Sequence, residues 1–200
     1  MATAGGEGRG AKGDRELGPS DWTVLALVAE GQTHGWAIAM QVARGGEVGS
    51  IWSLARPIVY QALERLENLG LIKTTGIVRG SRGPHRVMYQ ATPKGRKQVH
   101  DWLSKPVEHV RDIRSLFLLK VVLSQRAGID VEPLLVAQRA VILPLVHLLE
   151  AQLDDADPLA APGEATMLQF RVETTQTIVR FIDTLLDQVS GRPRRHRPRS

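Results

Sequence analysis

The sequence predicts a mainly α-helical protein with a small β-hairpin, in which an N-terminal domain is followed by a helical C-terminal domain. Three observations support this fold class. Between residues 20 and 72, short segments carry apolar residues at helical spacing and end at glycines. Two β-rich runs then flank a loop of glycine, proline and arginine. Beyond residue 104 the chain consists mainly of long apolar patterns with a helical period.

Composition and charge divide the chain into four segments. Residues 1–16 are glycine-rich and polar, and residues 190–200 contain five arginines and no acid, so both ends are expected to be disordered. Residues 17–104 hold ten basic and six acidic residues, whereas residues 105–189 hold eight basic and twelve acidic ones. Opposite charge balances in the two central segments indicate two modules with different partners.

The N-terminal domain is predicted to begin with three helices. The first, "SDWTVLALVAEG", has Ser20 as its N-cap and ends at Gly31. After the turn "QTHG" comes a second helix, "WAIAMQVARGG", and then "EVGSIWSL", which is expected to be a brief extended segment. The third helix lies within "SLARPIVYQALERLENLGLI". Its apolar face consists of Val59, Ala62, Leu63, Leu66 and Leu69.

A β-hairpin and a fourth helix complete this domain. The runs "LIKTTGIV" and "HRVMYQAT" flank the loop "RGSRGP", and the fourth helix, "PKGRKQVHDWLS", follows. Three short helices followed by a hairpin is the element order of a winged helix-turn-helix domain, which we assign to residues 17–104. A three-helix bundle with an unrelated hairpin is the alternative.

The hairpin and the third helix carry the side chains that DNA binding requires. No Asp or Glu occurs between residues 68 and 100, as a phosphate-facing surface needs, because phosphate contacts are electrostatic. As a recognition helix, the third helix would read base edges with Gln61 and Arg65 and contact phosphates near its start. The candidate DNA-binding residues are Ser53, Arg56, Tyr60, Gln61, Arg65, Lys73, Arg79, Arg82, His85 and Arg86. A solvated basic loop without a ligand is the alternative.

The C-terminal segment is predicted to be a helical dimerisation domain over residues 105–189. The segment "SLFLLKVVLSQ" is apolar nearly all round and should be buried, and "EPLLVAQRAVILPLVHLLEAQL" is a long helix kinked at Pro144. After the linker "DDADPLAAPGEA", the last helix has two adjacent apolar stripes, one of them a heptad repeat. The candidate dimer-interface residues are Met167, Phe170, Ile178, Val179, Phe181, Ile182, Leu185 and Leu186. Packing only within one chain is the alternative.

The sequence contains no pattern for an enzyme, a metal site, a cofactor or a membrane span. There is no cysteine, no pair of histidines has metal-ligand spacing, and no nucleophile or Walker motif occurs. The G-x-G-x-x-G of Gly8, Gly10 and Gly13 lacks the strand and helix that nucleotide binding needs. The longest apolar run, residues 141–149, is too short to span a membrane. We therefore expect a cytoplasmic protein that is not an enzyme and holds no metal or cofactor.

Three motifs resemble the PadR family of transcriptional regulators. These are "HGW" at the start of the second helix, "VYQALERLENLGLI" in the third and "YQATPKG" at the end of the hairpin, and the resemblance covers residues 17–104. It implies that Tyr60 is the recognition-helix tyrosine and that Arg82 and Arg86 are wing arginines. The long helical C-terminal half is similar to that of members with an extended dimerisation domain.

We therefore predict a sequence-specific DNA-binding transcriptional regulator. It would bind a palindromic operator on double-stranded DNA as a homodimer, most simply as a repressor, and a small-molecule effector would release it. The effector pocket is expected among helices at the dimer interface, near Trp22, Trp36 and Trp102. Two alternatives stay open: a helical protein-interaction adaptor whose winged domain does not bind DNA, and a sequence-blind nucleic-acid binder that uses the tail at residues 190–200.

Overall fold

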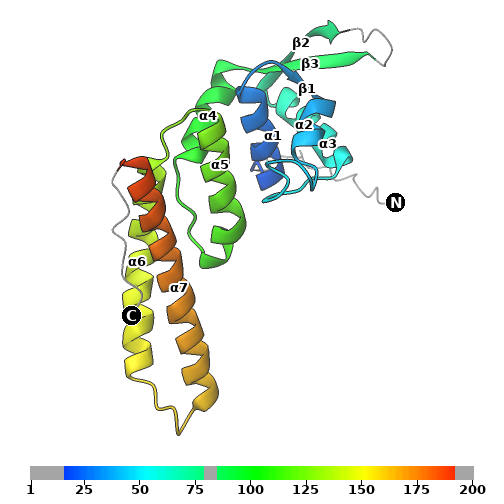
Figure 1. Cartoon of the computed structure of the whole chain (residues 1–200). Coiled ribbons are helices and arrows are strands. Elements are labelled where there is room, and N and C mark those ends of the chain that lie inside the picture. Colours follow the sequence, from blue (N-terminus) through cyan, green and yellow to red (C-terminus); the bar gives the residue numbers. More distant parts are fainter. Residues whose placement is uncertain (1–15, 79–84, 192–200) are drawn as a thin grey trace, which may run out of the picture.

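The computed structural model describes residues 16–78 and 85–191, and within these ranges the protein is mainly helical with a small antiparallel sheet (Figure 1). This confirms the predicted fold class. The predicted N-terminal arm apart from Glu16, and the predicted basic tail apart from Ser190 and Gly191, lie outside the described residues.

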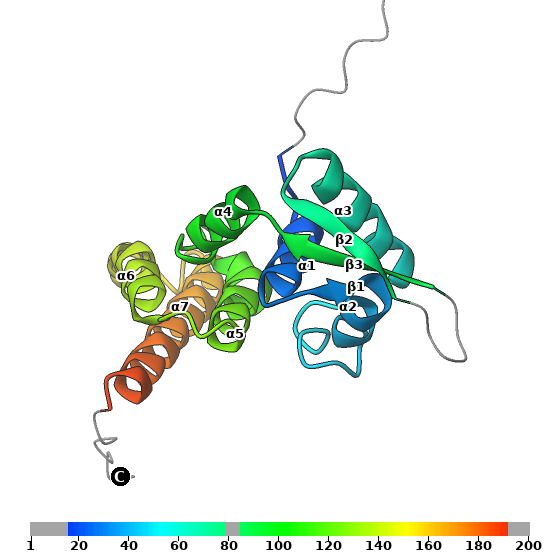
Figure 2. The ribbon, with the colours of Figure 1, turned by 90° about the horizontal axis from the view of Figure 1, so that it is seen from above.

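The N-terminal part has the element order of a winged helix-turn-helix domain. Its elements are α1 (Pro19–Ala29), β1 (Thr33–His34), α2 (Gly35–Gln41), α3 (Arg56–Asn68), β2 (Ile72–Val78), β3 (Arg86–Ala91) and α4 (Pro93–Leu103). All strand pairs are antiparallel, and β3 lies between β1 and β2. The hairpin of β2 and β3 forms the wing, and the sheet lies over α1, α2 and α3 (Figures 1 and 2).

Three details of this part differ from the sequence-based expectations. The helix α1 begins at Pro19, and the N–H of Gly18 donates to the Asp21 carboxylate at 3.0 Å, so Ser20 lies inside the helix and is not its N-cap. Residues 47–54 form mostly turns, and the expected extended segment is absent there. The strand β1 was not predicted from the sequence, because its two residues are too few to show an alternating pattern.

A hydrophobic core joins the elements of this domain. The residues that α3 buries in it are four of the five predicted: Val59, Ala62, Leu63 and Leu66. Close packing of α4 against the start of β2 depends on Gly95, because a Cβ at this position would lie 2.0 Å from the carbonyl oxygen of Leu71. The third helix is thereby fixed with one face in the core and the other exposed.

The C-terminal part is a series of helices that ends in a long antiparallel hairpin. Its elements are η1 (Val110–Asp112), the π-helical turn η2 (Ile113–Phe117), α5 (Leu118–Arg126), α6 (Glu132–Asp154) and α7 (Pro162–Val189). The hairpin of α6 and α7 extends away from the winged domain (Figure 1). The helix α6 continues through the exposed Pro144, and residues 155–161 connect it to α7.

The helix α5 is shared between the two parts. Leu119 and Leu123 belong to the core of the winged domain, whereas Phe117 and Val121 belong to the core that α6 and α7 complete. The predicted domain boundary after residue 104 therefore lies upstream of a helix that contributes to both cores.

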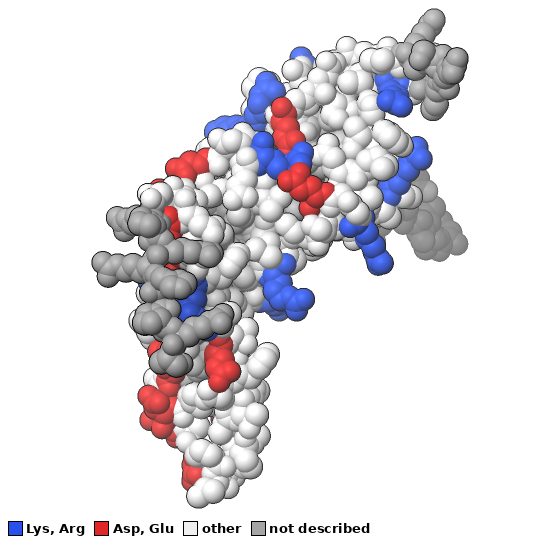
Figure 3. All heavy atoms as spheres, in the orientation of Figure 1, with Lys and Arg blue, Asp and Glu red and all other residues white. Residues whose placement is uncertain are grey.

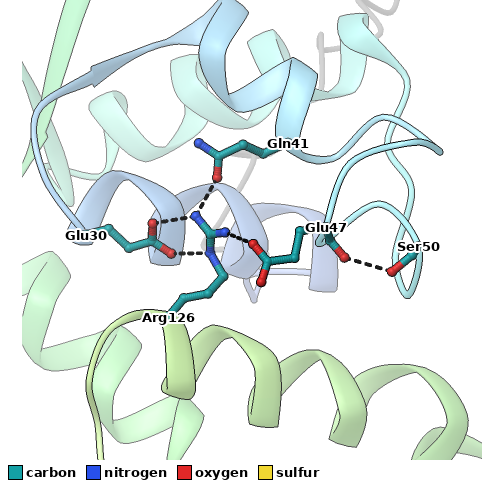
Figure 4. A network of polar contacts seen from close by, with 5 residues as sticks. All are labelled: Glu30, Gln41, Glu47, Ser50 and Arg126. Carbon is teal, nitrogen blue, oxygen red and sulfur yellow. Dashed lines mark hydrogen bonds and ion pairs between the residues drawn. The ribbon is translucent and has the colours of Figure 1, made fainter.

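Arg126, at the end of α5, connects this helix to three segments of the winged domain (Figure 4). Its guanidinium donates to both carboxylate oxygens of Glu30 at 2.8 Å, to the side-chain oxygen of Gln41 at 2.8 Å, and to Glu47. The Arg126 side chain is only 20% exposed, so solvent screens this pairing weakly. The interactions with Glu30 and Glu47 raise the pKa of Arg126.

Two polar contacts of α6 join it to neighbouring segments. The buried side chain of Gln138 accepts from the N–H of Val107 at 2.7 Å and donates to the carbonyl of Val107 at 2.9 Å, so both of its polar atoms are satisfied. Arg139 pairs with Asp183 of α7 at 2.7 Å. The connecting segment before η1 is thus attached to the hairpin by side-chain-to-backbone bonds.

By length and composition alone, α6 could cross a membrane, and it is the one helix within residues 16–78 and 85–191 that could. Its most apolar window has a mean hydropathy of 1.6, which differs from the expectation that no segment would qualify. Its buried residues form cores with α5 and α7, and a core helix of a soluble protein meets the same criteria.

We expect Arg126→Met to lower the free energy of unfolding by about 2 kcal/mol, because it removes several charge-assisted hydrogen bonds at once and leaves Glu30 unpaired. Arg126→Lys should recover only part of this loss, since an ammonium group cannot form the two parallel bonds. Urea denaturation measures both variants. The control is Lys97→Met, which removes an exposed pair with Asp101 and should change stability by less than about 0.5 kcal/mol. A loss in Arg126→Met no larger than that of the control would contradict a stabilising role.

The environment of Lys120 makes its contribution to the stability of the protein depend on pH. Its ammonium group donates to the carbonyl of Lys105 at 2.7 Å and lies 4.8 Å from the centre of the Trp102 ring. Burial, and secondarily the charge of Lys105, lowers the pKa of Lys120 to about 8. Between this value and the ordinary pKa of 10.5, the unfolded chain binds more protons than the folded protein, so this residue's contribution to stability rises with pH.

The stability of the unaltered protein relative to Lys120→Met should therefore increase from about pH 7 to about pH 10. Urea denaturation of both proteins at the two pH values measures this difference, in which titrations common to both cancel. A difference that does not change with pH would mean that Lys120 keeps its proton in the folded protein.

Candidate nucleic-acid interface

The N-terminal half of α3 presents an exposed polar surface. Arg56, Tyr60 and Gln61 are all exposed, whereas Val59 between them is buried, because the period of the helix turns every third or fourth residue toward the core. The Arg56 guanidinium lies 5.6 Å from the centre of the Tyr60 ring. Pro57 occupies the first turn, where a missing N–H leaves no bond unmade. This half of α3 contains no acidic residue.

The C-terminal half of α3 is occupied with contacts inside the domain. The Arg65 guanidinium donates to the Asp21 carboxylate at 2.9 Å, and Asp21 is buried. Glu67 accepts from the N–H and the hydroxyl of Thr74 at 3.1 and 2.6 Å. Arg65 therefore stabilises a buried carboxylate, which its removal would leave unpaired, and its own side chain is 45% exposed. That Arg65 also reads a base stays a prediction.

The wing and the segment before α3 add further exposed polar and basic side chains. Lys73, His85 and Arg86 are exposed, and Ser53 is exposed in the segment that precedes α3. Arg79 and Arg82 lie outside the described residues. In the view of Figure 3, basic side chains are spread over the winged domain with some acidic ones among them, and further acidic side chains lie along the α6 side of the hairpin.

A pocket lies between the start of α3 and the base of the wing. It has a volume of about 680 Å³, and none of the described residues that line it is acidic. The lining residues are His34, Gly35, Trp36, Arg56, Tyr60, His85, Arg86, Val87 and Tyr89. Burial, together with the charge of Glu67, raises the pKa of Tyr89, so its hydroxyl keeps its proton.

His34 and Trp36 line this pocket and were not among the DNA-binding candidates predicted from the sequence. The Arg86 guanidinium lies 5.3 Å from the centre of the Trp36 ring and 3.2 Å from the Nε2 atom of His34. The only sequence signal is the motif "HGW", which indicates the start of α2 but not that a wing arginine packs on it, because Arg86 lies 50 residues further along the chain.

The two apolar stripes of α7 have different environments. The heptad stripe packs on α6. Ile182 within this stripe is fully buried in the core, so it offers no surface to a partner chain. The other stripe faces outward, with Met167, Phe170 and Phe181 exposed by 52%, 69% and 40%. The remaining candidates are partly buried: Ile178, Val179, Leu185 and Leu186.

The described residues contain no group of three or more His, Asp or Glu side chains that could hold a metal ion. What the site does contain is exposed basic, aromatic and amide side chains on a helix and a wing. Such groups bind phosphates and base edges by hydrogen bonds and charge.

Comparison with known proteins finds similar sequences among transcriptional regulators. Residues 24–101 match the model of the transcriptional regulator PadR-like family. The negative transcriptional regulator PadR of Bacillus subtilis (strain 168) is 23% identical over 177 residues, which cover 84% of this chain and 96% of that protein.

Similar solved structures include two of Bacillus subtilis PadR, one in complex with operator DNA and one in complex with p-coumaric acid. The first is 19% identical, with a TM-score of 0.41, and the match covers 84% of this chain and 98% of that one. The second is 20% identical, with a TM-score of 0.39, and the match covers 88% and 99%. The match of residues 24–101, which include α2, α3 and the wing, makes the winged domain of this chain similar to the PadR-like family of transcriptional regulators.

Proposed function

We propose that this regulator binds double-stranded DNA sequence-specifically, with the N-terminal half of α3 in the major groove. The observation that carries the proposal is the exposed, acid-free surface of Arg56, Tyr60 and Gln61 beside the basic base of the wing. Gln61 has the donor and acceptor that pair with adenine, and the basic side chains around it suit phosphates. Since its proposed ligand is DNA, we place the protein in the cytoplasm.

We further propose a homodimer formed through the outward stripe of α7. Met167, Phe170 and Phe181 expose large apolar surfaces, and much of the surface over the lower part of α7 is uncharged in the view of Figure 3. A two-fold dimer would repeat one recognition helix about 34 Å away, so the expected operator is an inverted repeat. This interface leaves out Ile182.

We also propose that the protein is a repressor released by a small-molecule effector. The Bacillus subtilis relative, which matches over most of both chains, is named a negative transcriptional regulator. For the effector, a pocket of about 450 Å³ lies beside Trp22 and Trp102, whose rings stack at 5.4 Å. Of the three tryptophans expected near the effector pocket, only Trp22 and Trp102 line this one, and Trp36 does not.

The first experiment is selection of bound fragments from random duplex DNA at about 0.15 M salt with non-specific competitor. Recovery of an inverted repeat would support a dimeric, sequence-reading regulator. Binding without a shared motif would favour the sequence-blind binder, and deletion of residues 190–200 would then abolish it. No binding, with or without an added extract of small molecules, would favour the adaptor.

Gln61→Ala should weaken binding to the selected duplex by about 1–3 kcal/mol and relax the base preference at one position of each half-site. Competition binding against duplexes that vary at each position measures both effects. Arg65→Ala is the comparison, because its partner Asp21 is buried: it should lower the free energy of unfolding while base preference stays as in the unaltered protein. Relaxed preference in Arg65→Ala and not in Gln61→Ala would reverse our assignment of the base-reading residue.

The double variant Phe170→Asp and Phe181→Asp should shift the protein from dimer to monomer, because it places charges in an apolar interface. Sedimentation velocity measures the change. Gln169→Asp, which adds one carboxylate at an exposed polar position of α7, is the control and should remain dimeric. A double variant that stays dimeric would place the interface elsewhere.

A further inference from the structure

At the base of the wing, a side-chain nitrogen of His34 and one of Arg86 lie within hydrogen-bond distance, but the two side chains together offer no suitable acceptor for this contact. The Nδ1 atom of His34 accepts the N–H of Ala37 at 3.0 Å, which caps α2, and Nε2 lies 3.2 Å from an Nη atom of Arg86. A guanidinium has only donors, and a neutral imidazole has one donor and one acceptor. With Nδ1 accepting, Nε2 carries the hydrogen, so two donors face one another.

The other tautomer does not remove this conflict. If Nε2 accepted from Arg86, Nδ1 would carry the hydrogen and would face the N–H of Ala37. Each neutral form of His34 therefore leaves one pair of donors in contact. An anionic oxygen with several lone pairs resolves the conflict, because it accepts from His34 Nε2 and from Arg86 together while Nδ1 continues to cap α2.

The surroundings hold these two donors in place. Trp36 lies under the Arg86 guanidinium, with 5.3 Å from the guanidinium carbon to the ring centre, which limits the orientations of that side chain. Gly35 lets Tyr60 approach closely, because a Cβ at Gly35 would lie 2.7 Å from the Tyr60 ring. The pocket thus gathers groups from the start of α2, the start of α3 and β3.

The chemistry of the pocket favours a phosphate. Arg56, His85 and Arg86 line it, and the described lining residues include no carboxylate that would neutralise them. Its position between the recognition helix and the wing is where a DNA backbone would pass if α3 enters the major groove.

We propose that this pocket is a clamp for one phosphate of the DNA backbone, with His34 Nε2–H and Arg86 as its paired donors and Trp36 as the residue that positions Arg86. The clamp rests on the DNA-binding function proposed above, and it adds His34 and Trp36 to the interface. It sets the register of α3 in the groove and reads no base itself.

The test measures affinity for one mixed-sequence duplex as a function of salt. Arg86→Gln should lower the slope of log affinity against log salt by about 0.9, because it removes one ionic phosphate contact. His34→Asn should weaken binding about tenfold with little change in slope, since asparagine still caps a helix but lacks the distal donor. The fold-loss of affinity in the double variant should be smaller than the product of the fold-losses in the two single variants, because both residues bind the same phosphate.

Arg171→Gln, an equal loss of charge on the exposed face of α7, is the control and should leave affinity and slope unchanged. Circular dichroism establishes that each variant is folded. If the unaltered protein binds the duplex but Arg86→Gln keeps its slope, or if the two losses multiply fully, the clamp is overturned while the proposed function stands. If the unaltered protein binds no duplex at all, both are overturned together.

Discussion

The orientation of the recognition helix relative to the helical hairpin depends on α5. One side of this short helix supplies Leu119 and Leu123 to the core of the winged domain, and the turn before it places Phe117 in the other core. Arg126 then joins its end to Glu30 and to the segment after α2 (Figure 4). Apolar packing holds the two parts together, and the guanidinium fork of Arg126 adds directional, bidentate bonds to this contact.

This arrangement gives the proposed regulation a physical route. A ligand changes DNA binding only if it prefers one arrangement of the dimer over another. Because α5 is packed into both cores, a shift of the hairpin would displace residues in the winged domain and change the distance between the two recognition helices of the proposed dimer. The pocket beside Trp22 and Trp102 lies at this junction, where Leu116 of η2 lines it and also contacts both cores. An occupant there would act on the element that the two parts share.

The sequence predicts those features that depend on neighbours along the chain. The helices, the hairpin and the buried face of α3 follow from apolar spacing and from glycines at helix ends, and the structure confirms that they form. The exception is the end of α2, which lies at Gln41, several residues before the glycines at which this helix was predicted to end. Features that join distant residues were missed, such as the pairing of Arg65 with Asp21 and the packing of Arg86 on Trp36, because no local pattern encodes a contact across 44 or 50 residues. Likewise, the two stripes of α7 look alike in sequence, and only the position of α6 determines which one is buried.

The polar face of α3 is thereby divided between two tasks. Its last two turns carry Glu64, Arg65 and Glu67, and two of these are held by Asp21 and Thr74, so they serve the fold. Acidic groups at this end would repel a phosphate backbone, and they can be tolerated only where the helix leaves the groove. The first two turns carry no acid, and the positive end of the helix dipole favours anions there. In the proposed complex, the charge distribution along α3 therefore favours the approach of its N-terminal end to DNA.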